Sequence, residues 1–250
     1  MKKVLSIFTI VSIFSLSAKD FSNSINTINH QKVLTQEILK EYSFKGMGNN
    51  FSDSKDKLSN KLKAYNRVSK ELSKIFSDKE SKKYIKASNK IWSDIEIVFK
   101  SKALKSEVLM LQKKTDKILN ELSKLMKIAL SKNNASRDSM VNISGYQAVI
   151  IERMSALYMM KTWGINDPKF NFKMRESITF FNNSLNKLID SPKTDEENQK
   201  TIKLIMRHFK FFEIMNASKT KYIPTLIYAK TNKIHKYIDK ITQRYIIKGK

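Results

Sequence analysis

The sequence predicts an all-α protein made of two tandem four-helix units, each an antiparallel bundle. Three observations support this fold class. The 250 residues include only 5 Gly and 3 Pro, so residues that interrupt helices are rare. Apolar side chains recur at helical spacing along most of the chain. The chain also aligns with itself, without a gap, when it is shifted by 116 residues.

The internal repeat rests on identical residues that keep one register over most of the chain. The identical pairs include Gln31 with Gln147, Tyr42 with Tyr158, Gly48 with Gly164, and Asn66 with Asn182. Two copies of this length account for nearly everything after residue 17. We therefore expect a first unit at 18–133 and a second at 134–250, joined near the Asn-rich stretch 133–136.

The first two helices of each unit follow from breakers and from an apolar stripe. In the first copy, a helix over about 24–45 is ended by Gly46 and Gly48. A second helix over about 54–76 carries one apolar stripe of Leu58, Leu62, Tyr65, Leu72 and Ile75. Short connections between long amphipathic helices predict antiparallel neighbours.

The third and fourth helices are indicated by a cap and by a regular seam. Ser77 followed by Glu80 predicts a capping box at the start of the third helix. The fourth helix, over about 104–130, has apolar residues at alternating spacings of four and three, which is typical of coiled coils. In the second copy the same seam includes Pro224, which fits only in a first turn.

The N-terminal segment predicts export to the periplasm. Lys2 and Lys3 precede the apolar stretch 4–16, and Ser17-Ala18 offers a signal-peptide cleavage site, so residues 1–17 would be removed. An uncleaved anchor is the alternative, although the apolar stretch is short for a bilayer span. No later segment is apolar enough to cross a membrane, so we expect a soluble mature chain.

The net charge of +25 does not by itself identify a partner. Lysines are spread along nearly every segment and interleaved with acids, which is typical of solvated helix faces. We expect no nucleic-acid partner for an exported chain. Binding to anionic surface polymers stays an alternative, and it would depend steeply on salt. The chain has no Cys, so disulfide and thiol chemistry are excluded.

The first helix of each copy carries a recognisable pattern. Segments 28–42 and 144–158, followed by Lys45-Gly46 and by Lys161 with Gly164, resemble the PilJ/NarX-type sensory domain, found at the N-terminus of type IV pili methyl-accepting chemotaxis transducers. The resemblance covers both copies. It implies periplasmic four-helix bundles on receptors and sensor kinases, with nitrate held between two first helices where the ligand is known.

The resemblance implies candidate ligand-binding residues. The position of the family's anion-binding Arg is Lys32 in the first copy and Ala148 in the second, while a second Arg of the pattern survives as Arg153. If the two first helices pair within one chain, His30, Gln31, Lys32, Gln147 and Arg153 are expected to line one pocket. The alternative is that the two glutamines fix the helix register in the core.

The sequence favours a non-enzymatic function. We find no candidate catalytic residue and no phosphate-binding loop, and the histidines show no metal-ligand spacing, so no metal or cofactor is expected. The expected function is sensory or ligand-binding, with a small anion such as nitrate or nitrite as ligand and a receptor or sensor-kinase domain as partner. The alternative is a helical scaffold or envelope-interaction protein that has lost its ligand.

Overall fold

The computed structural model describes residues 18–48, 54–132, 136–217 and 222–247, and within these ranges every regular element is a helix. The predicted signal peptide, residues 1–17, lies outside the described residues, as does most of the predicted joint between the copies. The helices are α1 (Ala18–Gly46), α2 (Ser54–Ile75), α3 (Lys79–Lys100), α4 (Lys105–Ser131), α5 (Ser136–Thr162), α6 (Phe170–Ile189), α7 (Glu196–Ala217) and α8 (Pro224–Ile247). The prediction of an all-α protein is confirmed.

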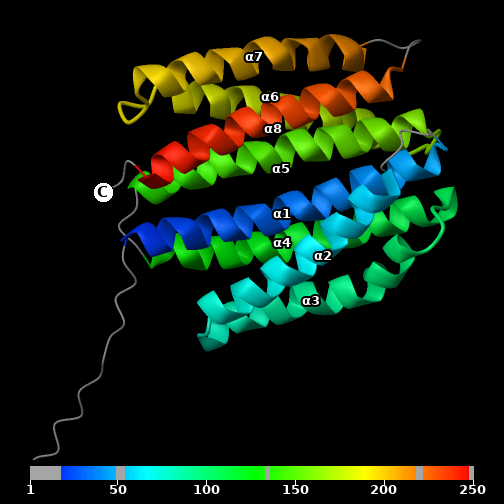
Figure 1. The fold of residues 1–250 in the computed structure, drawn as a ribbon, viewed down its shortest axis with the longest axis horizontal. Helices are drawn as coiled ribbons and strands as arrows, with labels where there is room; N and C mark the ends of the chain where they lie inside the picture. Colours follow the sequence, from blue (N-terminus) through cyan, green and yellow to red (C-terminus); the bar gives the residue numbers. More distant parts are fainter. Residues whose placement is uncertain (1–17, 49–53, 133–135, 218–221, 248–250) are drawn as a thin grey trace, which may run out of the picture.

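The helices form two groups that lie side by side (Figure 1). Helices α1 to α4 make up one group and α5 to α8 the other. Figure 1 shows α1 and α5 adjacent in the middle of the molecule, with α2 and α3 on one outer side and α6 and α7 on the other. Because α1 and α5 are each covered by neighbours on several sides, their polar residues are largely buried.

Local features recur at the 116-residue shift. Gly48 after α1 and Gly164 after α5 both have positive φ, 67° and 81°, a conformation that glycine adopts without strain. Asn66 on α2 and Asn182 on α6 each donate a hydrogen bond, of 2.8 and 2.7 Å, to a glutamate on the third helix of the same group. The two glycine turns and the two asparagine donors match at this shift, whereas the acceptors Glu96 and Glu213 are 117 residues apart.

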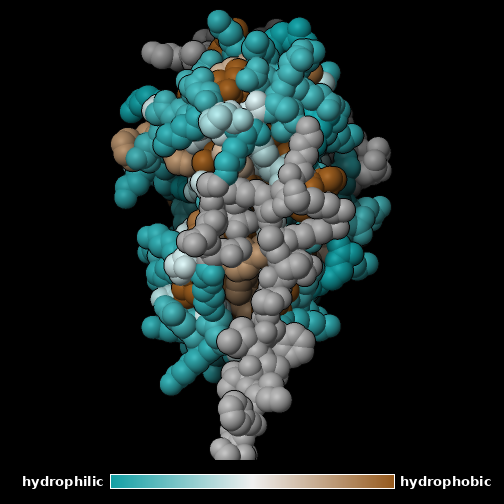
Figure 2. All heavy atoms as spheres, turned by 90° about the vertical axis from the view of Figure 1, so that its left-hand side faces the viewer, coloured by the Kyte–Doolittle hydropathy of each residue, from teal (hydrophilic) through white to brown (hydrophobic). Residues whose placement is uncertain are grey.

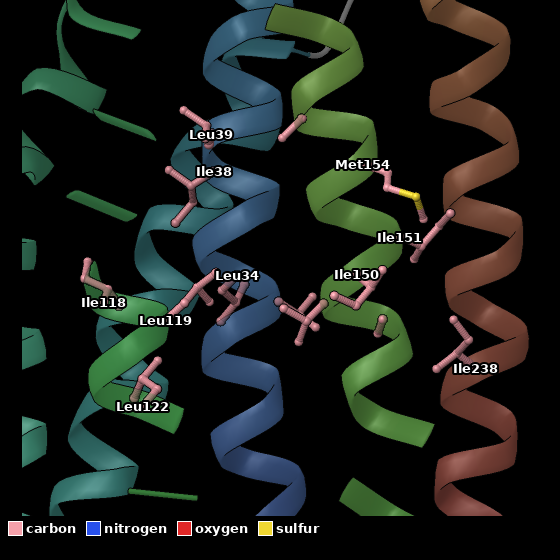
Figure 3. Packing of buried hydrophobic residues seen from close by; sticks show 14 of the residues in the cluster. Leu34, Ile38, Leu39, Ile118, Leu119, Leu122, Ile150, Ile151, Met154 and Ile238 are labelled. Atoms are coloured by element: carbon pink, nitrogen blue, oxygen red, sulfur yellow. The ribbon is translucent and has the colours of Figure 1, made fainter. Parts of the chain in front are cut away.

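The apolar core is continuous from one group to the other. The predicted seam of the fourth helix is buried from Val108 to Ala129, whereas Leu104 precedes the helix and is exposed. In Figure 3, Leu34 and Ile38 of α1 are seen close to the labelled residues of α4, and Met154 of α5 lies toward α8. The two central helices, α1 and α5, therefore join the two helix groups through one apolar core.

One predicted cap is wrong. Asp78 precedes α3, and its Oδ1 accepts a hydrogen bond of 2.9 Å from the backbone N–H of Ser81, so the capping residue is not Ser77. A carboxylate satisfies the free N–H groups of a helix start and also interacts favourably with the helix dipole. Lys132, just after α4, donates to the other carboxylate oxygen at 2.8 Å.

Figure 2 shows one end of the molecule, where brown hydrophobic residues occur only in small groups among hydrophilic ones. Within the described ranges, no helix combines the length and the apolar character that a bilayer span requires.

Candidate functional site

The site begins with the close packing of α1 against α5. Asn29 on α1 donates a 3.4 Å hydrogen bond to the backbone carbonyl of Asn142 on α5. Gly145 lies opposite the same side chain, and a Cβ atom there would come within 2.6 Å of the Asn29 Nδ2. Glycine at 145 thus permits the close approach of the two helices, and the first helices of the two copies are packed together as the pocket hypothesis requires.

The five predicted site residues do not share one cavity. His30 lines a cavity between α1, α5 and α8. Gln31 is buried beside the Tyr65 hydroxyl of α2. Gln147 is buried in the second group, where neither atom of its amide has a hydrogen-bond partner among the described residues. The two glutamines therefore lie inside the helix groups, in the surroundings that the register-fixing alternative describes.

Lys32 is a buried cation without an acidic partner. Only 3% of the residue is exposed, and its Nζ lies 5.3 Å from the centre of the Tyr146 ring on α5. No carboxylate of the described residues forms an ion pair with it, and burial lowers the pKa of the Lys32 ammonium to about 8. A charge removed from water without a counter-ion is costly, so this position is suited to receive an anion.

Arg153 and Tyr146 both line an open groove between α5 and α6 of about 790 Å³. Its guanidinium is 3.3 Å from the carboxylate of Asp116 on α4. The groove is lined by three cationic side chains, one acid and several aromatic rings: Arg153, Lys173, Arg175, Glu176, Tyr146, Phe172 and Phe180. Lys173 is likewise paired with Asp167 at 3.4 Å, so acids outside the groove partly compensate its cations, and its lining offers both guanidinium groups and aromatic rings to a ligand.

A second polar cluster, not predicted from the sequence, lies between α1, α5 and α8. Lys40 and Glu152 form a buried ion pair of 2.7 Å, with 1% and 0% of their side chains exposed. Glu41 lies 3.9 Å from the same ammonium and accepts a 2.6 Å hydrogen bond from the hydroxyl of Tyr228 on α8. Because each charge has an opposite partner, the pair is tolerated in the core.

His235 of α8 extends this cluster toward solvent. Its Nδ1 lies 2.9 Å from Oε1 of Glu152 and 3.9 Å from Oε1 of Glu37, and its Nε2 lies 3.5 Å from Asp239. Although burial disfavours the charged imidazole, the surrounding carboxylates raise the pKa of His235 above its ordinary value. Lys40 and His235 in turn hold the pKa of the Glu152 carboxyl at about 2, against the effect of burial.

The cavity beside His235 has a volume of about 360 Å³. Gly145 and Ala148 line it from α5, and the equivalent positions on α1 hold the larger residues Asn29 and Lys32. Because Gly145 and Ala148 are small, the cavity opens on the α8 side of the α1–α5 pair. Lys32 lies on the α6 side, against Tyr146. The two sides of the central pair are therefore chemically different.

Sequence reasoning missed this cluster because its members come from separate segments. Lys40 and Glu152 are 112 residues apart in the chain, and His235 and Glu152 are 83 apart. One signal was present. Glu152 follows the four apolar residues Ala148 to Ile151 on a helix with a largely apolar sequence, and an acid on a buried helix needs a partner.

Comparisons of the chain with protein families, characterised proteins and solved structures find no match. The resemblance to the PilJ/NarX-type domain thus rests on the residue patterns of the two first helices. The ligand, the partner and the periplasmic location that it implies are proposals.

Proposed function

We propose that the protein is a non-enzymatic sensory protein that binds a small anion, such as nitrate or nitrite, beside Lys32. The observation that carries the proposal is the buried Lys32 ammonium, which has no acidic partner among the described residues. An anion in contact with it would supply the missing counter-charge. The bound state would therefore be stabilised by an interaction that the free protein lacks.

The groove between α5 and α6 supplies a route for the anion. Tyr146, whose ring lies against Lys32, lines this groove together with Arg153 and Arg175. An approaching anion would meet a positive potential before it reached the buried ammonium. Movement of the Tyr146 ring would then couple binding to the packing of α1 against α5.

Signalling would require a partner, because the described helices include no membrane span. We propose that the exported chain acts through the periplasmic domain of a receptor or sensor kinase. The scaffold alternative is favoured by one observation: Gln31 and Gln147 lie in the cores of the two groups and line none of the pockets described above.

Thermal unfolding of the purified protein in nitrate, nitrite and chloride, at constant ionic strength, tests the proposal. A ligand at 100 times its Kd adds about 2.7 kcal/mol to the free energy of unfolding. Lys32→Met should abolish the stabilisation. Lys203→Met, which removes an exposed cation on α7, should leave it intact.

Equal stabilisation of the wild type and of Lys32→Met would rule out this site. The absence of stabilisation by any of the anions would contradict anion sensing. Together with a stable complex between the protein and another envelope protein, that absence would favour the scaffold.

A further inference from the structure

Three potential metal ligands converge beside the cavity between α1, α5 and α8, and two of them, Glu37 and His235, line it. Glu37, Glu152 and His235 each offer one ligand atom, and these atoms all lie within 4.8 Å of one another. The Nδ1 of His235 is 2.9 Å from Oε1 of Glu152 and 3.9 Å from Oε1 of Glu37. Two ligands of one ion at 2.0–2.2 Å lie about 3–3.5 Å apart, so small side-chain movements would complete the geometry.

The hydrogen-bond partners of Glu152 and Glu37 do not prevent the ligand oxygens of these carboxylates from binding a metal ion. Lys40 donates to Oε2 of Glu152, and the Oε1 atom faces His235. This arrangement fixes the carboxylate as an outer-shell partner does in metal proteins. Lys61 donates to both oxygens of Glu37, but 35% of its side chain is exposed, so it is free to withdraw into solvent.

The charge of the cluster favours a cation. Its charged side chains, besides His235, are four carboxylates and two ammonium groups: Glu37, Glu41, Glu152, Asp239, Lys40 and Lys61. Carboxylates outnumber ammonium groups even while Lys61 is in place. When Lys61 withdraws, a divalent ion restores the balance in a partly buried setting where unpaired charge is costly.

The adjoining cavity provides access and one more acceptor. His30 and Asp239 line it together with Glu37 and His235, so an entry path and space for metal-bound water are present. Asn29 also lines this cavity. It is 2% exposed, and its Oδ1 has no hydrogen-bond partner in the described part of the chain. Water held by an ion would be a donor for such an acceptor.

From this geometry we propose that Glu37, Glu152 and His235 bind one divalent transition-metal ion, which displaces Lys61. Two carboxylate oxygens and one imidazole nitrogen with open positions suit Zn²⁺, Mn²⁺ or Co²⁺. The site is separate from the proposed anion site, since neither Lys32 nor the α5–α6 groove takes part in it.

Calorimetric titration of the chelator-treated protein with Zn²⁺ tests the site, and the visible spectrum of a Co²⁺ complex reports the coordination. We expect one ion per chain. Glu37→Gln and His235→Gln should each weaken binding by about tenfold or more, as loss of a ligand does. His208→Gln, which changes a histidine on α7 that belongs neither to the cluster nor to the cavity lining, is the matched control and should bind as the wild type does.

Lys61→Met separates a metal site from a merely structural cluster. Because it removes the ammonium that competes for Glu37, it should tighten Zn²⁺ binding by about tenfold, and it does not depend on the folding of the ligand variants. Weaker or unchanged binding in Lys61→Met would overturn the proposal. So would the absence of Zn²⁺ binding to the wild type, or a loss of binding in His208→Gln alone.

Discussion

Replacing Lys32 by Met should stabilise the protein at neutral pH. Methionine retains most of the unbranched side chain and removes a buried charge that has no acidic partner among the described residues. Burial lowers the pKa of this ammonium from 10.5 to about 8, which corresponds to about 3 kcal/mol of unfavourable free energy at pH 7. The Tyr146 ring offsets about 1 kcal/mol of that cost, so the expected net gain is about 2 kcal/mol.

The effect has a defined pH dependence. Between pH 8 and 10.5 the unfolded chain holds a proton on Lys32 that the folded chain has released, so the contribution of Lys32 to stability rises with pH. From pH 7 to 9.5 the unfavourable contribution falls by about 2 kcal/mol. The stability difference between wild type and Lys32→Met should therefore be clearly smaller at pH 9.5 than at pH 7, with about 1 kcal/mol remaining because the unfolded chain is still largely protonated there.

Urea unfolding of both proteins at pH 7 and 9.5 measures this difference, with exposed Lys203→Met as the control that should change stability by less than about 0.5 kcal/mol. NMR titration of the Lys32 side chain measures its pKa directly. A difference that is the same at both pH values, or a Lys32→Met variant less stable than the wild type at pH 7, would refute the reasoning. Lys32 would then have a counter-charge that the structure lacks.

Three further predictions concern the helix contacts. Gly145→Ala should lower the free energy of urea unfolding by about 1 kcal/mol, since the added Cβ would lie 2.6 Å from the side-chain amide nitrogen of Asn29 on α1. A more stable variant would mean that the higher helix propensity of alanine outweighs this clash. Lys40→Met should cost about 3–5 kcal/mol, because buried Glu152 keeps only His235 as a partner and Glu41 loses its ammonium, and adding Glu152→Leu should recover part of that cost in the same assay. Asp78→Ala should lower thermal stability by the equivalent of about 1 kcal/mol, whereas Ser77→Ala should leave it unchanged. If Ser77→Ala destabilised the protein more than Asp78→Ala did, Ser77 would be the capping residue.

The helices were predictable because their signals are local. The breakers at Gly46 and Gly48, the seam from Val108 to Ala129 and the position of Pro224 each depend on residues within a few turns of one another. The cap of α3 was misjudged by one residue because Ser77 and Asp78 are adjacent and both are good capping residues. Only the backbone geometry distinguishes them.

The site was less predictable because it depends on which faces of α1 and α5 meet. The predicted pairing of the first helices is present, but a helix turns by about 100° per residue, so His30, Gln31 and Lys32 point in three directions. The partners of Glu152 come from α1 and α8, and no spacing within one segment could have indicated them.

Under the 116-residue repeat proposed from the sequence, differences at equivalent positions account for the different charge on the two sides of the central pair. Glu37 and Arg153 occupy equivalent positions, and each is paired with an opposite charge, on α2 and α4 respectively. Lys32 and Ala148 are also equivalent, and the change opens a cavity on one side only. If both copies carried the same residue at each of these positions, side chains of like charge would lie on both sides of the buried α1–α5 interface. Divergence at these positions leaves an acidic, histidine-containing cavity beside α8 and a basic groove beside α6, which suit ligands of opposite charge.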